Sequence, residues 1–252
     1  MPAANPVAYR ERLYSRYVHA RDRPLAPGGL DDMNMQARLH GLRDMVRRCA
    51  PPDKQATILD LGCGHGAVIH AFRLEGYQQI SGVDGSLEQV EAARRLGILG
   101  VAQGDMLDTL AAAPAQSLDC VVTYDVIEHL TKTELISFVD EVHRVLRPGG
   151  RWIIHAPNGE SPLGGKMIYW DFTHEVAFTR TSLTQLLMAS GFASVECFED
   201  RPVPHGIKSA IRAVLWRLIR CGWLAYIAIE TGGTDRRAIF SQNLLAVAIR
   251  GT

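Results

Sequence analysis

A glycine turn between an apolar run and a helix constrains this chain most. Residues 58–66 read ILDLGCGHG, and residues 67–73 continue as AVIHAFR. The first run is typical of a buried strand, and the second is typical of the start of a helix. A strand that turns on glycines into a helix places bare backbone and a helix N-terminus against a ligand. The stretch therefore predicts a nucleoside-binding turn, and its Gly62-x-Gly64-x-x-Ala67 spacing fits a dinucleotide as well.

Two further apolar runs end in acids. Residues 79–86 read QISGVDGS, and the carboxylate of Asp84 can accept both hydroxyls of a ribose. Residues 100–106 read GVAQGDM, where Asp105 is placed to accept an adenine amine and Met106 to pack on the ring. Together with the acid at Asp60, this pair favours S-adenosylmethionine over NAD. A NAD-binding oxidoreductase stays as an alternative, although no partner for hydride transfer is evident.

Strand-like and helix-like runs alternate along most of the chain, which predicts a mostly parallel, doubly wound α/β sheet. Residues 1–50 are expected to form an N-terminal helical cap with helices at about 7–20 and 33–49. Residues 51–252 are expected to form the main domain, with a helical insert at about 200–241. The expected strands are 57–61, 79–83, 98–103, 118–124, 150–156, 193–199 and 242–249.

Five motifs occur in one order, and together they carry a resemblance. They are DLGCGHG at 60–66, GVDGS at 82–86, GDM at 104–106, DVIEHL at 125–130 and LRPGG at 146–150. Over about residues 56–200 the chain resembles the class I S-adenosylmethionine-dependent methyltransferases. Within DVIEHL, the EHL sequence at residues 128–130 is most similar to that of the ubiquinone-biosynthesis-type and sugar-modifying small-molecule branch of this family. The resemblance implies a Rossmann-like sheet in the order 3-2-1-4-5-7-6 with the last strand antiparallel.

The resemblance also implies a cofactor site at the ends of the first four strands. In it, the glycines cradle S-adenosylmethionine, Asp60 lies near its methionine amino group, and Asp84 holds the ribose. The residues implied for the cofactor are Asp60, Gly62, Cys63, Gly64, Gly66, Asp84, Gly85, Asp105, Met106, Tyr124 and Asp125.

Glu128, His129 and His174 are the candidate catalytic residues. The first two follow the fourth strand, where a methyl acceptor would approach. An imidazole with an ordinary pKa near ~6.5 can serve as a base at neutral pH. The alternatives are that Glu128 orders a loop, that His129 caps or packs, and that His174 pins its own loop. The two histidines rank equally as the base.

The loop around His174 carries the acceptor prediction. It reads YWDFTHEVAFT over residues 169–179 and is similar to the D-x-T-H-x-x-x-F-T segment of methyltransferases that act in glycan biosynthesis. Aromatic and polar groups together suit a sugar or a ring, so Tyr169, Trp170 and Asp171 are expected to bind the acceptor. We predict an O-methyltransferase of a sugar or glycan precursor, which could be lipid- or nucleotide-linked. A phenolic or quinone-type acceptor and a non-catalytic, cofactor-binding relative remain as alternatives.

Residues 207–229 predict a basic amphipathic helix. Lys208, Arg212, Arg217 and Arg220 share a rough face, and apolar residues fill much of the rest. Such a helix can lie on a membrane surface, although four charges argue against a transmembrane span. The alternative is packing on the core or on a second subunit. Near the N-terminus, Tyr9, Tyr14 and Tyr17 are interpreted as a lid over the cofactor.

The overall composition argues against some classes of partner. Lys plus Arg equals Asp plus Glu at 27 each, which argues against a general nucleic-acid footprint. The five Cys show neither metal-ligand nor disulfide-scaffold spacing, and no metal is expected. The N-terminus lacks the apolar stretch of a signal peptide, so the protein is expected in the cytoplasm or at the inner face of the membrane.

Overall fold

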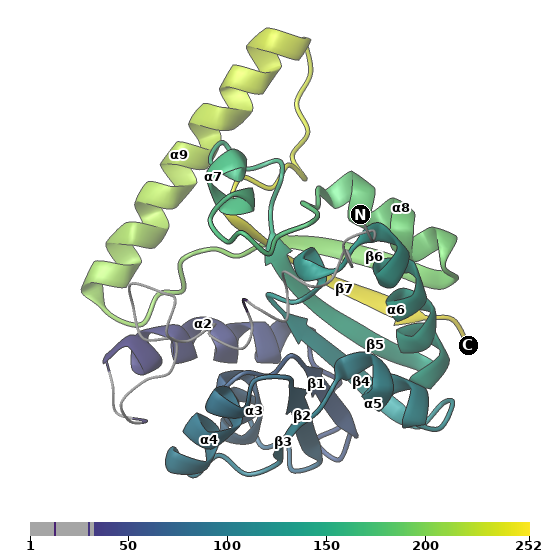
Figure 1. The fold of residues 1–252 in the computed structure, drawn as a ribbon. Coiled ribbons are helices and arrows are strands. Elements are labelled where there is room, and N and C mark those ends of the chain that lie inside the picture. Colours follow the sequence, from purple (N-terminus) through teal and green to yellow (C-terminus); the bar gives the residue numbers. More distant parts are fainter. Residues whose placement is uncertain (1–12, 14–29, 31–32) are drawn as a thin grey trace, which may run out of the picture.

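A seven-stranded sheet forms the centre of the molecule in the computed structural model, which describes Leu13, Leu30 and residues 33–252 (Figure 1). The strand order is β3-β2-β1-β4-β5-β7-β6. Strands β1 to β5 run parallel, whereas β7 is antiparallel to both of its neighbours. This confirms the predicted fold class and strand order. The strands are β1 Ile58–Leu61, β2 Ile80–Asp84, β3 Val101–Gln103, β4 Leu118–Tyr124, β5 Leu146–Pro157, β6 Phe192–Glu199 and β7 Asn243–Arg250.

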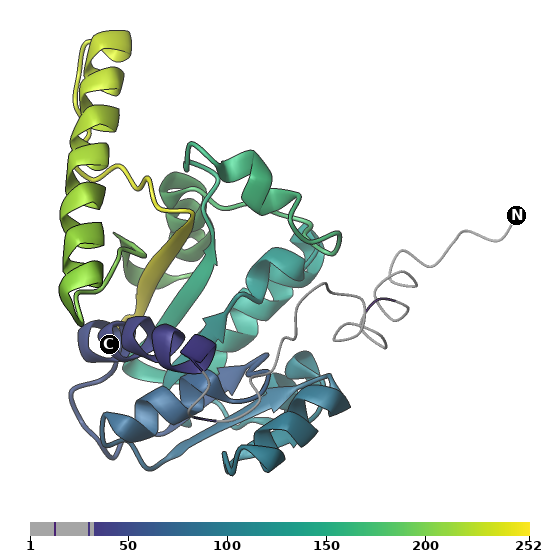
Figure 2. The same ribbon diagram turned by 90° about the vertical axis from the view of Figure 1, so that its left-hand side faces the viewer.

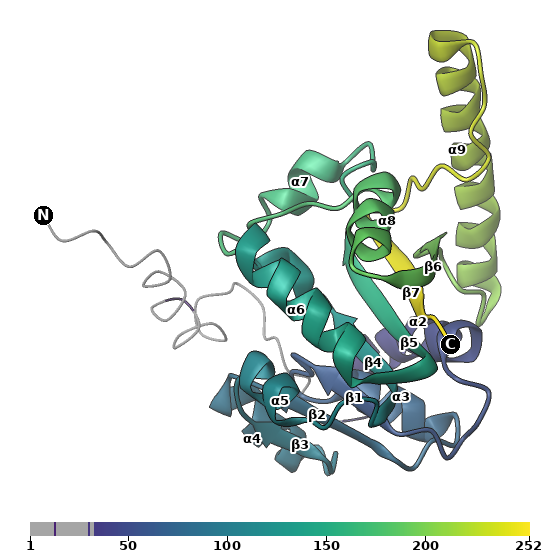
Figure 3. The same ribbon diagram turned by 90° about the vertical axis from the view of Figure 1, so that its right-hand side faces the viewer.

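Helices cover both faces of the sheet and bury a separate apolar cluster on each (Figure 3). Parallel strands buried on both faces need apolar side chains on both, which explains the continuous apolar runs in the sequence. One face carries α2 Met33–Cys49, α3 Ala67–Leu74 and α4 Leu87–Arg95. The other carries α5 Met106–Ala112, α6 Lys132–Val145 and α8 Arg180–Ala189.

The carboxyl ends of the parallel strands meet at one edge of the sheet. Leu61 pairs with Val83 and with Thr123, and Tyr124 pairs with His155. The turn after β1 therefore lies beside the ends of β2 and β4, as in other doubly wound sheets that bind ligands at this edge. The short elements η1 Ile127–His129 and α7 Gly164–Ile168 lie on the loops that follow β4 and β5.

The helix α9 Ile207–Thr231 projects from this body, with its beginning near α2 (Figure 2). Its middle is held at the end of β6, because Trp216 and Arg220 both contact Glu199. It confirms a helix within the predicted insert at 200–241. The proposed boundary near residue 50 stays a prediction. The expected helix at 7–20 and the lid of Tyr9, Tyr14 and Tyr17 lie outside the described residues.

Candidate functional site

The glycine turn is fastened to the end of β2 by one carboxylate. The Oδ2 of Asp84 accepts from the backbone N–H of Gly64 at 2.7 Å, and its Oδ1 accepts from Ser86 at 2.8 Å. Each oxygen keeps a second lone pair for a ligand hydroxyl. The structure thus brings together the predicted cradle and the predicted ribose-binding acid.

The glycines of the turn serve two different purposes. At Gly62, with φ of 71°, a Cβ would lie 2.5 Å from a methyl carbon of Val126, so packing within the chain demands glycine there. At Gly64, with φ of 53°, the nearest atom to a Cβ would be 3.7 Å away, so the space is open to a ligand. From the sequence, the approach of a ligand is the expected reason for glycine throughout the turn. At Gly62 packing against Val126 already requires glycine, whereas at Gly64 ligand approach stays a prediction. Cys63 lies buried between them.

Asp60 is fully buried, and neither of its carboxylate oxygens has a hydrogen-bond partner among the residues that the structure describes. Burial, together with the charge of Asp84, raises the pKa of Asp60 well above its usual range. A buried polar group without a partner is costly, and such groups are rare in folded proteins. A ligand that brings a cationic amino group would remove this cost, so the residue fits the amino end of S-adenosylmethionine.

Three further cofactor candidates, Gly85, Asp105 and Met106, follow the ends of β2 and β3. The Oδ1 of Asp105 caps α5 by accepting from the N–H groups of Leu107 and Asp108 at 2.7 and 3.1 Å. Met106 packs partly against the core on the α5 side. A Cβ on Gly85 would meet nothing within 4 Å. Adenine binding by Asp105 and Met106 therefore remains a prediction.

A second polar cluster lies where β4 and β5 end. Tyr124 stacks on His155 with ring centroids 3.9 Å apart, and the Arg38 guanidinium lies 5.2 Å from the Tyr124 centroid. The Nδ1 of His155 donates to Asp125 at 2.6 Å, and its Nε2 faces Asp200 at 3.4 Å. Asp125 has a left-handed φ of 56°, which non-glycine residues adopt seldom and often at functional sites.

Electrostatics in this cluster favours a charged pair. Burial alone would lower the pKa of His155, but the electrostatic contributions of Tyr124 and Asp125 and the bonds to Asp125 and Asp200 raise it well above its usual value. Burial would raise the pKa of Asp125, but the charge and hydrogen bond of His155 lower it. An imidazolium that donates from both nitrogens fits this arrangement.

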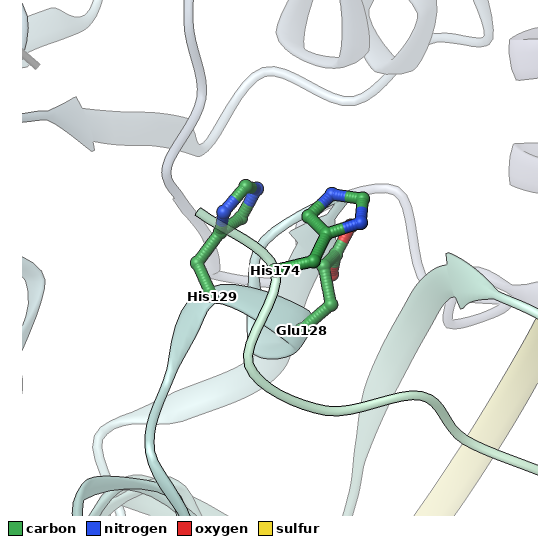
Figure 4. A group of neighbouring side chains, drawn as sticks. All are labelled: Glu128, His129 and His174. Atoms are coloured by element: carbon green, nitrogen blue, oxygen red, sulfur yellow. The ribbon is translucent and has the colours of Figure 1, made fainter. Parts of the chain in front are cut away.

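The three predicted catalytic side chains converge in space (Figure 4). Glu128 and His129 come from η1, and His174 comes from the loop after α7. That loop is held in place because the N–H groups of Glu175 and Val176 donate to the carbonyl oxygen of Glu128. The His129 and His174 rings meet edge to face, with centroids 4.8 Å apart.

Hydrogen bonds fix the tautomer of His129. The hydroxyl of Thr173 donates to Asp171 at 2.7 Å, and its oxygen lies 2.7 Å from Nδ1 of His129. Because the hydroxyl has a single proton, Nδ1 must be the donor to Thr173, and the basic lone pair of the neutral ring is then on Nε2. We call Asp171, Thr173 and His129 the relay. The sequence motif contains Thr173, but nothing in the sequence indicated its contact with His129.

The protonation states within this group differ. Burial and the neighbouring His174 lower the pKa of His129 to about 4, so its ring is neutral at pH 7. Burial and the charge of Asp125 raise the pKa of Glu128 well above its usual range, and within the described part of the chain its Oε2 has no hydrogen-bond partner. The Nδ1 of His174 faces the carbonyl oxygen of Ile168 at 3.1 Å and donates to it.

The same three residues offer ligand atoms that lie within 4.8 Å of one another and could hold a metal ion. The sequence showed no ligand spacing because His174 lies 45 residues after His129 along the chain. The predicted acceptor residues Tyr169 and Trp170 are 87% and 64% exposed beside this group.

Comparison with known proteins gives a consistent family. Residues 33–197 match the family described as a methyltransferase domain. A probable S-adenosylmethionine-dependent methyltransferase of Mycolicibacterium smegmatis is 30% identical over 167 residues, 65% of this chain and 62% of that protein. Another, from Mycobacterium tuberculosis, is 28% identical over 243 residues, 88% of this chain and 86% of that protein. Trans-aconitate 2-methyltransferase of Azoarcus is 34% identical over 122 residues, 48% of this chain.

This chain spans about three fifths of the Mycolicibacterium relative and 46% of the Azoarcus protein. Among solved structures, a SAM-dependent methyltransferase from Archaeoglobus fulgidus shares the fold with a TM-score of 0.65 at 21% identity. That likeness covers 86% of this chain and 97% of the other. The chain therefore belongs to the methyltransferase-domain family of S-adenosylmethionine-dependent enzymes.

Proposed function

We propose that the protein transfers a methyl group from S-adenosylmethionine to a hydroxyl of a small molecule. The relay is the observation that carries this proposal, because it supplies an oriented neutral imidazole beside the glycine turn's edge of the sheet. Asp60 and Asp84, with the backbone at Gly64, would hold the cofactor. When bound, S-adenosylmethionine supplies an electrophilic methyl group on a sulfonium.

The chain's own contribution is to position the acceptor and to accept its proton. An alcohol is a poor nucleophile, and a positioned base accelerates such reactions by about 10²–10⁴-fold. His129 is the proposed base, because its Nε2 carries the lone pair and Asp171 supports the opposite nitrogen through Thr173. Glu128, with its raised pKa, would donate a hydrogen bond to an acceptor oxygen. His174 would limit the space beside His129.

A sugar or glycan precursor is the proposed acceptor. The exposed rings of Tyr169 and Trp170 offer stacking surfaces, and Asp171 offers a carboxylate next to them. A phenolic or quinone-type acceptor would use the same rings. It would need less help from a base, however, because a phenol has an ordinary pKa near ~10, and the relay therefore favours an alcohol.

We also propose that α9 contacts an anionic membrane surface, where a lipid-linked sugar would be available. Its inward face is marked by Ser209, Trp216 and Leu224, and its opposite face exposes apolar side chains over most of its length. These exposed side chains are Ile207, Ile211, Val214, Leu215, Leu218, Ile219, Tyr226 and Ile229. We call them the α9 stripe.

Basic residues flank the α9 stripe, and the span 207–229 holds no acid. Two copies packed through this stripe would bring like charges together, whereas anionic lipid would neutralise them. Among the described residues, no helix is both long enough and apolar enough to cross a membrane.

The experiment that tests the activity incubates purified protein with S-adenosylmethionine and matched panels of sugars, sugar nucleotides and phenols. Mass spectrometry then identifies any methylated product and the atom that carries the methyl group. We expect an O-methylated sugar derivative. Products confined to phenols would overturn the sugar acceptor, and products methylated on nitrogen or carbon would overturn O-methylation.

A further inference from the structure

A pocket of about 300 Å³ lies between α2, the start of α9 and the loop that joins β6 to α9. Tyr124 and His155 line it from the ends of β4 and β5. The pocket therefore opens at the ligand-binding edge of the sheet, beside the ends of β4 and β5. Its walls are tied together by His40 of α2 and His205 of the loop, whose rings stack 3.9 Å apart.

The lining of this pocket is strongly cationic. Arg38, Arg201 and Arg212 all line it, from three different segments of the chain. In the part of the chain that the structure describes, none of the three forms an ion pair. The one acid of the lining, Asp200, already faces the ring of His155. The three guanidinium groups outnumber the one acid of the lining, and they therefore leave a net positive charge at the cavity.

The start of α9 adds to this field. Ser209 lies in its first turn and lines the pocket, and its hydroxyl is engaged by the N–H of His205 and the carbonyl of Gly206. The N-terminus of a long helix carries a partial positive charge from its unpaired N–H groups. The same pocket thus receives positive charge from side chains and from backbone.

We propose that this pocket binds a phosphate or pyrophosphate group of the methyl acceptor. The proposal rests on the proposed function in taking the pocket as part of the acceptor site. Arginine forks match phosphate oxygens with paired hydrogen bonds, and several guanidiniums suit a multiply charged group better than a single carboxylate. Such a group would come from a nucleotide-linked sugar or from a lipid-linked one.

The roles of the three arginines differ. Arg38 lies over Tyr124 and close enough to Asp60 to influence its pKa, so changing it would disturb the cofactor end of the site as well. Arg201 and Arg212 lie on the side of the pocket formed by the loop and α9. They are exposed, and their replacement by glutamine leaves the core untouched.

The test is calorimetric titration with inorganic pyrophosphate, run with and without S-adenosylhomocysteine. We expect the wild-type chain to bind pyrophosphate and the double variant R201Q/R212Q to bind it at least about tenfold more weakly. The matched control is R217Q, which removes an exposed arginine of α9 that does not line the pocket. It should bind like the wild type. All three proteins should bind S-adenosylhomocysteine equally.

Several outcomes would overturn the proposal. The first is that the wild-type chain does not bind pyrophosphate at concentrations up to about 5 mM. The second is that R201Q/R212Q binds pyrophosphate as tightly as the wild type. The third is that R217Q weakens binding as much as the double variant does, which would show an effect of overall charge. Failure to bind S-adenosylhomocysteine, with pyrophosphate still bound, would instead count against the proposed methyl transfer alone.

Two further probes distinguish the sources of the phosphate. UDP-glucose represents a nucleotide-linked sugar, and farnesyl pyrophosphate represents a lipid-linked one. Tighter binding of either than of pyrophosphate supports the pocket and assigns its source. Equal affinity for pyrophosphate, UDP-glucose and farnesyl pyrophosphate supports an anion subsite that contacts only the pyrophosphate group.

Discussion

At the scale of single residues, one substitution in the relay should reduce turnover without changing cofactor binding. Replacing Thr173 by valine keeps the shape of the side chain but removes the hydroxyl between Asp171 and His129. The ring of His129 then loses the contact that orients it and fixes its tautomer. We expect turnover to fall by about 10²-fold, within the range for a positioned base, while the Kd of S-adenosylhomocysteine stays unchanged.

The matched control is Thr133→Val, because Thr133 is an exposed threonine on α6. It should keep full turnover. If Thr173→Val turns over like the wild type, the relay has no part in catalysis. If turnover falls in His174→Ala but not in Thr173→Val, His174 is the base instead of His129.

The His155 and Asp125 pair predicts how stability depends on pH. A histidine whose pKa is raised in the folded protein stabilises it fully below the unfolded value of ~6.5, and this stabilisation is lost as pH rises through the folded value. The lowered pKa of Asp125 gives the opposite dependence on pH. Asp125 stabilises the folded protein above its unfolded pKa of ~3.9, and this stabilisation is lost as pH falls through the pKa in the folded protein. The pair should therefore stabilise most between about pH 4 and 6.5.

Asp125→Asn tests this, because asparagine tolerates the left-handed backbone at this position. Chemical denaturation should show the largest loss of unfolding free energy, relative to wild type, near pH 5.5 and a smaller loss at high pH. A loss that grows between pH 6 and 9 would show that the pair is not charged in the way described.

At the scale of elements, the α9 stripe predicts membrane binding that depends on both apolar and basic groups. Replacing Ile211 and Leu218 by glutamine removes two exposed apolar side chains from this stripe. We expect wild-type protein to sediment with vesicles of phosphatidylglycerol but not of phosphatidylcholine, and the double variant to bind at least about tenfold more weakly, because each lost side chain is worth more than ~1 kcal/mol of burial.

Ile136→Gln on α6 is the control, since it removes an apolar side chain of similar exposure from another helix. Equal sedimentation of all variants would exclude the stripe as the membrane contact. A wild-type dimer in light scattering that becomes a monomer in the double variant would assign the stripe to a second copy of the chain.

The elements that the sequence predicts well are those governed by local periodicity. The central strands β1 and β4 were predictable because a strand buried on both faces demands a continuous apolar run. The arrangement of charges on α9 was predicted less well. Arg220 was expected on the same face as Lys208, Arg212 and Arg217, but it points inward and pairs with Glu199. That partner lies 21 residues earlier, and periodicity carries no information about it.

The candidate site shows the same division. The cofactor side follows a strand, turn and helix in local sequence, so the positions of Asp60, Gly64 and Asp84 could be predicted. The contact between Thr173 and His129 and the cationic pocket could not. Both depend on which segments the tertiary fold brings together at the carboxyl edge of the sheet.

At the scale of the whole molecule, cofactor binding should couple to global stability, because the proposed cofactor site joins the turn after β1 to the end of β2. A ligand that binds only the folded state at 100 times its Kd adds about 2.7 kcal/mol. For a chain of this size each kcal/mol raises Tm by about 2–4 °C, so S-adenosylhomocysteine should raise the Tm by roughly 5–10 °C. NADH at equal concentration should not raise it.

Asp84→Ala should abolish most of this rise, because Asp84 both anchors Gly64 and offers the lone pairs expected to hold the ribose. Asp140→Ala, which removes an exposed acid of α6, should leave the rise intact. Scanning calorimetry of the three proteins with each ligand measures both effects. A full rise with Asp84→Ala would mean that the ribose lies elsewhere, and a rise with NADH alone would mean that this family member has exchanged its cofactor. A rise confined to S-adenosylhomocysteine and dependent on Asp84 would place the cofactor across β1 and β2, which leaves the ends of β4 and β5 for the acceptor.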